Sequence, residues 1–405
     1  MSHSFLTARG TALLAVSTGL IAANLYYIQP LIPTIAADLG IAVSTVQVLL
    51  TASQLGFALG ILLILPLGDL IRPRTLITVL LSIEALALVA LALSTNAVVL
   101  GIAVTVVGVT NLSAQVIVPA AANLAAPGSA PRVVSTVIGG LLTGILLART
   151  VAGLIATSWG WRPVFIGAAI LMVALIPVLR PVLGGAARPA TLGTRYSAIL
   201  TGTVRIFRAH PELRIRSLYG ALMFALFSLL WSTLALLLER SPYYGYSEAV
   251  IGLFGLLGVA GALCATLLGR IRGLSAGTRT ALLILVALIG AVALSAGATN
   301  VAALIVGILL VDVAVQGIHV TNQHVIYAVI APSERGRANG VYMAGYFGGG
   351  VIGTALATLA WGIDGWAGVA VVGIAIVVIT GIVRLFDRPR TAPTSSDTAQ
   401  VSTHA

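Results

Sequence analysis

The sequence predicts an all-α membrane protein with twelve transmembrane helices, arranged as two pseudo-symmetric bundles of six. Three observations predict this fold class. First, 59% of the 405 residues are hydrophobic and only 8% are charged, whereas a soluble domain carries roughly 25% charged residues. Second, twelve apolar segments are long enough to cross a bilayer. Third, two motifs recur about 200 residues apart and in the same order, which indicates a duplicated unit.

The composition also bears on the class of function. A mean hydropathy of +1.09 argues against soluble enzymes and nucleic-acid modules, despite a net charge of +11. The single cysteine, Cys264, has no partner for an intrachain disulfide. The sequence has no Walker phosphate-binding motif and no His, Cys or Asp cluster with metal-ligand spacing. We therefore expect a lipid bilayer as the main environment, no nucleic-acid partner, no enzymatic activity, no cofactor and no metal.

The expected spans each need about 20 apolar residues. They cover residues 11–33, 45–68, 74–94, 97–125, 133–158, 162–183, 217–239, 248–269, 278–297, 300–328, 337–360 and 366–386. The longest polar stretch, residues 184–216, divides them six and six. The predicted domains are thus an N-terminal bundle (1–183), a cytoplasmic linker (184–216), a C-terminal bundle (217–386) and a disordered cytoplasmic tail (387–405).

The linker ends in RIFRAHPELRIR, in which apolar residues alternate with arginines. This pattern favours an amphipathic helix on an anionic membrane surface, and a flexible linker is the alternative.

The arginines predict the orientation of the chain, which contains no lysine. With the N-terminus inside, 19 arginines lie in cytoplasmic segments. Only Arg162 and Arg240 lie outside, and Arg149 falls within a span. This bias follows the positive-inside rule. We expect a multi-pass protein of a bacterial inner membrane with both termini in the cytoplasm.

Two pairs of segments form the internal repeat. PLGDLIRPR at 66–74 corresponds to LLGRIRG at 267–273, and the glycine-rich 139–153 corresponds to 345–357. Small residues let helices approach closely in lipid. We expect a rocking interface at these glycines, with simple close packing as the alternative. The glycines concerned are Gly139, Gly140, Gly144, Gly153, Gly345, Gly349 and Gly353.

These features resemble the major facilitator superfamily over residues 10–386. The family's signature in the loop between spans two and three is G-x-L-[AG]-D-[RK]-x-G-[RK]-[RK]. It is matched at Leu67, Gly68, Asp69 and Arg74, and the chain departs from it at Leu65, Leu70, Arg72 and Pro73. In the second half, Gly269-Arg270 lacks the acidic residue that often stands there in the family.

The resemblance implies a gate that holds the two halves together on the cytoplasmic side. The expected gate residues are Gly68, Asp69, Arg72, Arg74 and Arg132. Asp69 is expected to cap a facing helix end or to pair with Arg132, which opens span five. The alternative for Arg72 and Arg74 is a role in topology alone, and both roles can hold together.

Further segments resemble one bacterial branch of the family, the arabinose-efflux and drug-efflux permeases. They are NLYYIQPLIPTIA at 24–36, QLGFALGILLILPLGD at 54–69, GILLARTVAG at 144–153 and RGRANGVYMAGYFGGG at 335–350. This branch implies a secondary transporter, and the segments do not specify a substrate.

Span ten carries the most informative polar residues. Asp312, Gln316, His319 and Gln323 are spaced to lie on one helical face, with Asn322 beside them. By resemblance, the tenth helix lines the central cavity. We interpret this stripe as a solute-binding surface with Asp312 as proton carrier. The alternative is a structural hydrogen-bond network between helices.

Four polar residues elsewhere are further candidates for solute binding: Asn24, Tyr27, Asn111 and Gln115. Asn24 and Tyr27 share a face of span one, near Gln29, and an aromatic belt at the outer interface is the alternative there. Asn111 and Gln115 belong to span four, which lines the central cavity by resemblance to the family. Trp231 in span seven is a candidate aromatic wall, although core packing is favoured.

Arg149 and Glu84 are the remaining ionisable residues deep in the first half. Such groups are costly in a bilayer and are functional candidates by default. A Glu84–Arg149 pair would neutralise both. The alternative for Arg149 is a direct role in coupling, so we count Asp312, Glu84 and Arg149 as candidates for proton coupling.

We therefore expect a monomeric, proton-driven exporter of a small organic solute. The alternatives are a proton symporter or facilitator that imports a sugar or other metabolite, and a non-transport membrane protein such as a sensor.

Overall fold

The computed structural model describes residues 6–127, 129–185, 196–258, 260–261, 273–331 and 334–387. All regular elements in these ranges are helices, as the sequence predicts. The first bundle contains α1 (Ala8–Ala23), η1 (Gln29–Leu31), α2 (Ile32–Leu39), α3 (Val43–Leu63), η2 (Leu65–Asp69), α4 (Pro73–Ala92), α5 (Ala97–Thr110), α6 (Ser113–Leu124), α7 (Ala130–Trp159), α8 (Arg162–Val182) and η3 (Leu183–Gly185). After α9 (Tyr196–Ala209), the second contains α10 (Pro211–Arg240), α11 (Glu248–Leu253), α13 (Ala276–Ala296), α14 (Val301–Val329) and α15 (Arg335–Phe386).

Within the described ranges, nine helices are long and apolar enough to cross a membrane. One of them, α15, reverses direction at Asp364 and Gly365, where Gly365 adopts a φ of +54° that favours glycine. It therefore contributes two segments. Two shorter apolar helices, Ala8–Ala23 and Ala249–Gly258, supply further segments. The structure is consistent with twelve crossings, and the exact count remains a prediction.

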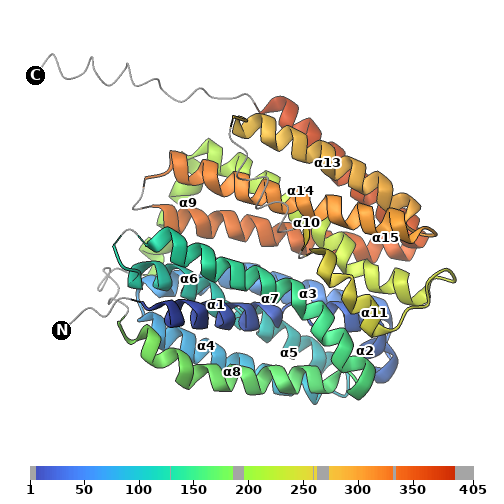
Figure 1. Ribbon diagram of the computed structural model, residues 1–405, viewed down its shortest axis with the longest axis horizontal. Coiled ribbons are helices and arrows are strands. Elements are labelled where there is room, and N and C mark those ends of the chain that lie inside the picture. The colour runs from blue at the N-terminus through green and yellow to red at the C-terminus, as the bar shows by residue number, and fades with distance from the viewer. Residues whose placement is uncertain are drawn as a thin grey trace, which may run out of the picture.

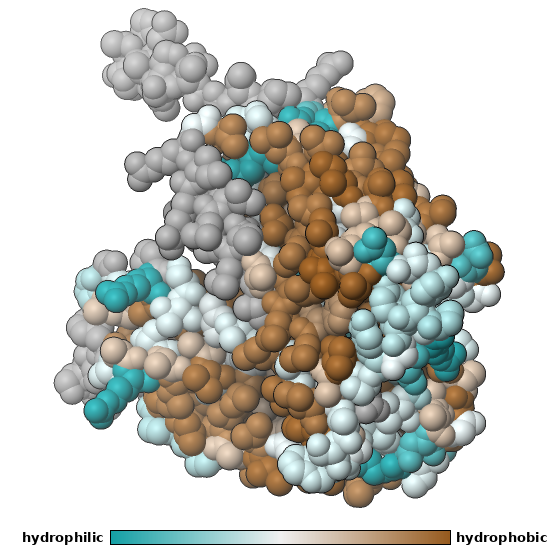
Figure 2. Space-filling view, turned by 45° about the vertical axis from the view of Figure 1, so that its right-hand side comes forward, coloured by the Kyte–Doolittle hydropathy of each residue, from teal (hydrophilic) through white to brown (hydrophobic). Residues whose placement is uncertain are grey.

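The helices form two groups that run roughly along one common direction (Figure 1). In the first, α1 packs on α7, α3 on α5, and α4 on α8. In the second, α10 packs on α15, and α13 on α14. Apolar side chains form a broad band across one face, and hydrophilic side chains gather toward its left and right edges (Figure 2). This distribution is the one expected of a protein whose middle faces lipid.

The end of the linker differs in detail from the single surface helix expected over residues 205–216. Helix α9 stops at Ala209, and α10 begins at Pro211, because proline cannot donate an N–H to the preceding turn but fits well at a helix start. The segment therefore splits between two helices. The hydroxyl of Tyr196 donates to the carbonyl of Leu63, which ties α9 to the end of α3. Residues 186–195 and 388–405, where more linker and the tail were expected, lie outside the described residues.

The glycines of α7 pack against α1 inside the first bundle. Gly140 lies against the backbone of Ala15, and Gly144 against that of Gly19, so closely that a Cβ at either glycine would overlap backbone atoms. The second bundle repeats this arrangement between α15 and α10. There, Gly349 and Gly353 lie against the backbones of Ala221 and Ala225. The same contact in corresponding helices supports a duplicated six-helix unit.

These contacts decide between the two interpretations of the glycines. Gly140 and Gly144 join helices of one bundle, and so do Gly349 and Gly353. They therefore serve close packing within each bundle, and the expected rocking interface is not found at these four positions.

A matched pair of substitutions tests this packing. Replacing Gly144 by valine should lower the melting temperature of the purified protein strongly, because the side chain would enter the backbone of Gly19. Overpacking of this kind costs about 1–3 kcal/mol. Gly139→Val is the control, because no atom lies within 4 Å of its added Cβ. Equal melting temperatures for the two variants would contradict the packing argument.

An ion pair joins α2 to α8 at the predicted outer end. Asp38 accepts hydrogen bonds from Arg162 and, at 3.1 Å, from the indole N–H of Trp161. The hydrogen bond from Arg162 is the main reason that the pKa of Asp38 is lowered from its ordinary value. A carboxyl group with a lowered pKa stabilises the fold above its unfolded pKa of about 3.9, and this contribution is lost as pH falls through the folded value.

The pH dependence of this pair should be small and measurable. Both side chains are more than a third exposed, so the pair contributes about 0–1 kcal/mol. Wild type should therefore melt slightly above Asp38→Asn at neutral pH. The difference should begin to fall at about pH 4 and should vanish only once the pH is below the lowered pKa of folded Asp38. A difference that grew on acidification would contradict this assignment.

Candidate functional site

The two bundles meet along several helix pairs. In the described residues, α3 packs on α15, and α7 packs on α11. Gln47 of α3 donates to the carbonyl of Ser232 at 3.4 Å, and Thr354 of α15 donates to Gln54 at 2.9 Å. Polar side chains therefore lie on the surface where the bundles must separate if the protein is to move.

Aromatic rings fill much of this interface. Phe57 of α3 makes an edge contact with Phe347 of α15, with 4.4 Å between ring centroids. Phe224 stacks on Tyr346 at 4.1 Å and on Phe227 at 5.3 Å. We call the residues of the second bundle that form this layer the aromatic cluster: Phe224, Phe227, Trp231, Tyr346 and Phe347. The cluster gives one side of the interface flat, apolar walls.

Arg149 of α7 is a buried cation that lies against this layer. It is only 2% exposed, and its guanidinium carbon lies 4.0 Å from the ring centroid of Trp231 and 5.2 Å from that of Tyr26. Its Nε donates to Gln29 at 2.9 Å and its Nη1 to Ile145 at 3.3 Å. Its Nη2 has no hydrogen-bond partner. Cation–π contacts and the Gln29 amide offset part of the cost of burying the charge.

Asp312 of α14 is a buried acid at the edge of the Trp231 indole. It is 1% exposed. Its Oδ1 accepts a hydrogen bond of 3.3 Å from the indole N–H of Trp231, and its Oδ2 has no partner. One indole therefore contacts a cation of the first bundle with its face and an acid of the second bundle with its edge.

The helix that follows α11 brings its backbone close to both charged residues. A Cβ at Gly255 would lie 3.1 Å from the Cβ of Arg149, and one at Gly258 would lie 3.1 Å from Oδ2 of Asp312. The same Cβ at Gly258 would approach Leu146 of α7 to 2.6 Å. Glycine at these positions allows the close approach. Arg149 and Asp312 thus border the same short stretch of the interface.

The rest of the predicted stripe on α14 faces its own bundle in part. His319 Nδ1 hydrogen-bonds the hydroxyl of Tyr342 at 3.0 Å, and Asn322 donates to the carbonyl of Arg216 at 3.2 Å. For these two residues the structure shows the hydrogen-bond network between helices that was the alternative. Gln316 and Gln323 are half-buried and make no hydrogen bond to another described residue, so they stay candidates for solute contact.

In the first bundle, Glu84 accepts hydrogen bonds from two residues that were predicted to bind solute. Its Oε1 accepts from Asn24 at 2.8 Å and from Asn111 at 2.6 Å. Glu84 is fully buried. Its Oε2 and the Oδ1 of Asn24 have no partner. These amides therefore turn toward Glu84 at the ends of α1 and α5. Among the described residues, no ion pair joins Glu84 to Arg149, which settles that question left open by the sequence.

Two other residues predicted to bind solute differ in exposure. Tyr27 is buried in the apolar core, and its neighbour Tyr26, not Tyr27, faces Arg149. Gln115 is half-buried and makes no hydrogen bond to another described residue.

The predicted cytoplasmic gate is only partly visible. The motif folds as η2 and the start of α4, and Arg72, Arg74 and Arg132 are exposed. A Cβ at Gly68 would meet only Leu76, at 3.9 Å, so this position does not require glycine sterically. The side chain of Asp69 lies outside the described part of the chain. Its pairing with Arg132 stays a prediction.

Two residues hold the buried charges, a role that the sequence did not assign to them. Gln29 anchors Arg149, and Trp231 joins Arg149 to Asp312. The sequence singles out both residues, because each carries a polar group inside an apolar span. Their charged partners could not be assigned from the sequence, because these contacts depend on how helices from the two bundles pack.

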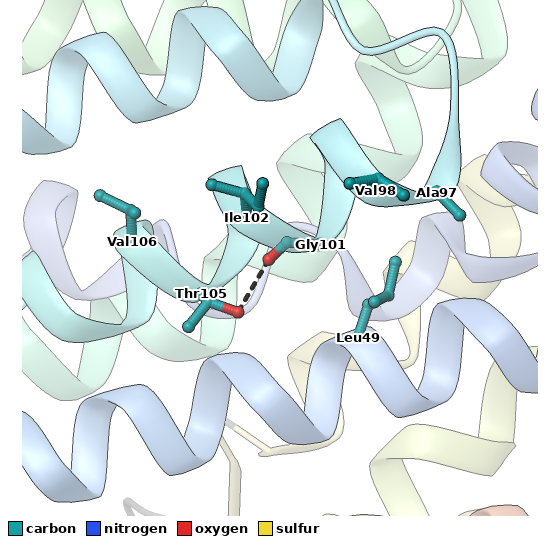
Figure 3. Close-up of a pocket in the computed structure, with 7 residues that line it drawn as sticks. All are labelled: Leu49, Ala97, Val98, Gly101, Ile102, Thr105 and Val106. Carbon is teal, nitrogen blue, oxygen red and sulfur yellow. Dashed lines mark hydrogen bonds between the residues drawn. The ribbon is translucent and has the colours of Figure 1, made fainter.

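The groove in Figure 3 does not belong to this site. It has a volume of about 550 Å³ and lies between α3 and α5, lined by Leu49, Ala97, Val98, Gly101, Ile102, Thr105 and Val106. The hydroxyl of Thr105 is already bonded to the carbonyl of Gly101. Such a groove offers no polar group to orient a solute.

Comparisons with known proteins identify the fold and its relatives. The family model described as Major Facilitator Superfamily matches residues 14–295 and 244–404. YgaY of Escherichia coli, named an uncharacterised transporter, is 42% identical over 375 residues, which are 92% of this chain and 93% of that protein. SCO4007 of Streptomyces coelicolor, described as a probable transporter, is 35% identical over 91% of this chain and 85% of its own length.

Solved structures with this fold have distant sequences. The nucleoside transporter NupG has a TM-score of 0.73 at 12% identity and covers 93% of this chain and 99% of its own. A POT family transporter in complex with 5-aminolevulinic acid has a TM-score of 0.74 at 16% identity, with 93% and 96% covered. These similarities show the shared architecture.

Proposed function

The chain belongs to the major facilitator superfamily and is a membrane transporter of that type, and we propose that it exports a small organic solute in exchange for protons by alternating access. The observation that carries the proposal is Asp312. It is a buried carboxyl group with one unpartnered oxygen, at the interface between the bundles and next to a cation of the opposite bundle. It is therefore the candidate that binds a proton in one state and releases it in another.

Charge balance explains why such a group suits coupling. An uncompensated charge at bilayer depth costs about 2.5–3.5 kcal/mol on insertion scales. Asp312 loses its charge when it binds a proton, and a solute held by the carboxylate can then be released. If protonation and solute binding exclude one another, the downhill entry of protons drives the uphill exit of solute. Glu84 is a second proton-binding candidate, because it is buried without an ion-pair partner among the described residues.

The direction of transport is supported by resemblance to the efflux branch, through segments 24–36, 54–69, 144–153 and 335–350. In the same proposal the protein acts as a monomer in a bacterial inner membrane. The arginine distribution supports its orientation, with both termini in the cytoplasm. Gln115, Gln316 and Gln323 contribute to solute binding as the half-buried amides of the predicted cavity.

Everted membrane vesicles test the proposal. With an imposed gradient, acid inside, addition of a transported solute should dissipate the gradient in vesicles that contain the protein and not in empty ones. Intact cells provide the second arm. Expression should lower the steady-state content of that solute in cells, whereas a rise would establish the import alternative and overturn the export proposal.

A further inference from the structure

The free polar atoms at the interface carry information about the solute. Nη2 of Arg149 and Oδ2 of Asp312 are buried, have no partner, and bear opposite charges. They come from opposite bundles, and both residues border the Gly255–Gly258 stretch. A ligand admitted between the bundles at this place would meet an unpartnered donor from one bundle and an unpartnered acceptor from the other.

We propose that the solute is a small zwitterion with an aromatic or other flat apolar group, an inference that rests on the transport function proposed above. Its carboxylate binds Nη2 of Arg149, and its ammonium group binds Oδ2 of Asp312. A charged guanidinium and a carboxylate make the strong, charge-assisted hydrogen bonds that such groups need in a buried site.

The surroundings of the two charges favour a ligand of this shape. Arg149 is already fixed by Gln29, by the carbonyl of Ile145 and by the ring of Trp231, and Nη2 is its nitrogen without a hydrogen-bond partner. Asp312 is fixed through Oδ1, and Oδ2 is its oxygen without a hydrogen-bond partner. Both residues are thus pre-organised, and the aromatic cluster supplies apolar walls for the remainder of the ligand.

Charge balance excludes a simpler ligand. A purely cationic solute would pair with Asp312 and leave Arg149 with an unpaired charge, and a purely anionic solute would do the reverse. Leaving a buried charge without its partner is strongly unfavourable. A zwitterion satisfies both residues and keeps the site neutral.

A binding experiment with matched probes tests the inference. The full-length protein in nanodiscs is titrated with the aromatic L-amino acids, with their amides, which keep only the ammonium group, and with their N-acetyl derivatives, which keep only the carboxylate. Binding is followed by tryptophan fluorescence and thermal shift. At least one amino acid should bind about tenfold or more tightly than both of its singly charged derivatives.

Substitutions then assign each charge. In Arg149→Gln, the amino acid should bind no better than its amide, because the carboxylate has lost its partner. In Asp312→Asn, it should bind no better than its N-acetyl derivative. Arg240→Gln, at an exposed position at the end of α10, is the control and should keep the wild-type preference. Rescue of this pattern by Asp312→Glu would support a charge contact over a structural effect.

The outcomes separate this inference from the transport proposal. Equal binding of an amino acid and one of its singly charged derivatives, or no binding by any probe, would overturn the zwitterion assignment. Proton exchange driven by a cationic amphiphile, without zwitterion binding, would overturn it too and leave proton-coupled export standing. Zwitterion binding without proton exchange would support the proposed binding site and would overturn the proposed coupling of solute export to proton entry.

Discussion

Asp312→Asn is expected to abolish proton exchange driven by solute. In everted vesicles with an acid interior, solute that dissipates the gradient through the wild type should have no effect above that in empty vesicles. Asparagine has the size of aspartate, and its amide oxygen can still accept the hydrogen bond of 3.3 Å from Trp231. What it lacks is a titratable oxygen at the position of Oδ2. The variant therefore tests proton binding with little change in packing.

Counterflow separates lost coupling from lost transport. Exchange of labelled for unlabelled solute across the membrane needs no net proton movement, so Asp312→Asn should still support it at raised solute concentration. Asp364→Asn is the matched control, because Asp364 is exposed at the reversal within α15 and should exchange protons as the wild type does. Normal proton exchange by Asp312→Asn would show that another group, with Glu84 as the first candidate, carries the proton.

Trp231 should have an intermediate effect that the sequence alone did not suggest. In Trp231→Phe the ring against Arg149 is retained, but the donor to Asp312 is lost. Asp312 is then held less firmly, and proton exchange should weaken without disappearing. The pH profile of exchange should also shift, which a purely structural role in packing would not cause. An unchanged rate and pH profile would argue against Trp231 as a positioning residue.

The fold could be predicted from the sequence because lipid imposes simple rules. Backbone groups must be satisfied internally and apolar residues must face the bilayer, so long apolar segments indicate helices directly. Breaks within a span are harder to predict. Helix α5 ends at Thr110 and α6 begins at Ser113, although the apolar run of span four continues on both sides of this break. The buried Glu84 binds Asn111 at this break, and that contact comes from a different helix.

The site was predictable at the level of residue type and not at the level of partners. Ionisable residues inside apolar spans pointed to Asp312, Glu84 and Arg149, because burial there needs a reason. Which residue pairs with which depends on tertiary packing. Glu84 contacts amides of its own bundle, whereas Arg149 crosses to the aromatic rings of the other. Helical spacing can place residues on one face, but it does not tell which neighbouring helix that face meets.

A disulfide across the predicted outer end of the interface is expected to stop transport reversibly. Thr157 of α7 and Ala249 of α11 belong to different bundles, and the Oγ1 of Thr157 accepts a hydrogen bond of 3.0 Å from the amide of Ala249. In a Cys264→Ser background, Thr157→Cys combined with Ala249→Cys should form a disulfide on mild oxidation, since the two positions are adjacent. Solute transport should then fall to the level of empty vesicles and return after reduction.

The reason lies in the alternation of access. In this structure α7 and α11 are in contact, and Thr150 also donates to the carbonyl of Gly252 at 2.7 Å. A transporter must separate these helices to open its site toward the outer side, and a covalent bond prevents that separation. The two single-cysteine variants, treated with the same oxidant, are the controls and should keep full activity.

The crosslink also distinguishes a transporter from a passive pore. A pore whose helices stay packed at Thr157 and Ala249 in every state would conduct equally well before and after oxidation. Loss of labelling by a thiol reagent shows that the disulfide has formed. Unchanged transport can then not be explained by a failure to form the crosslink. A fully crosslinked protein that moves solute at the wild-type rate would show that α7 and α11 need not part, and alternating access at this interface would have to be abandoned.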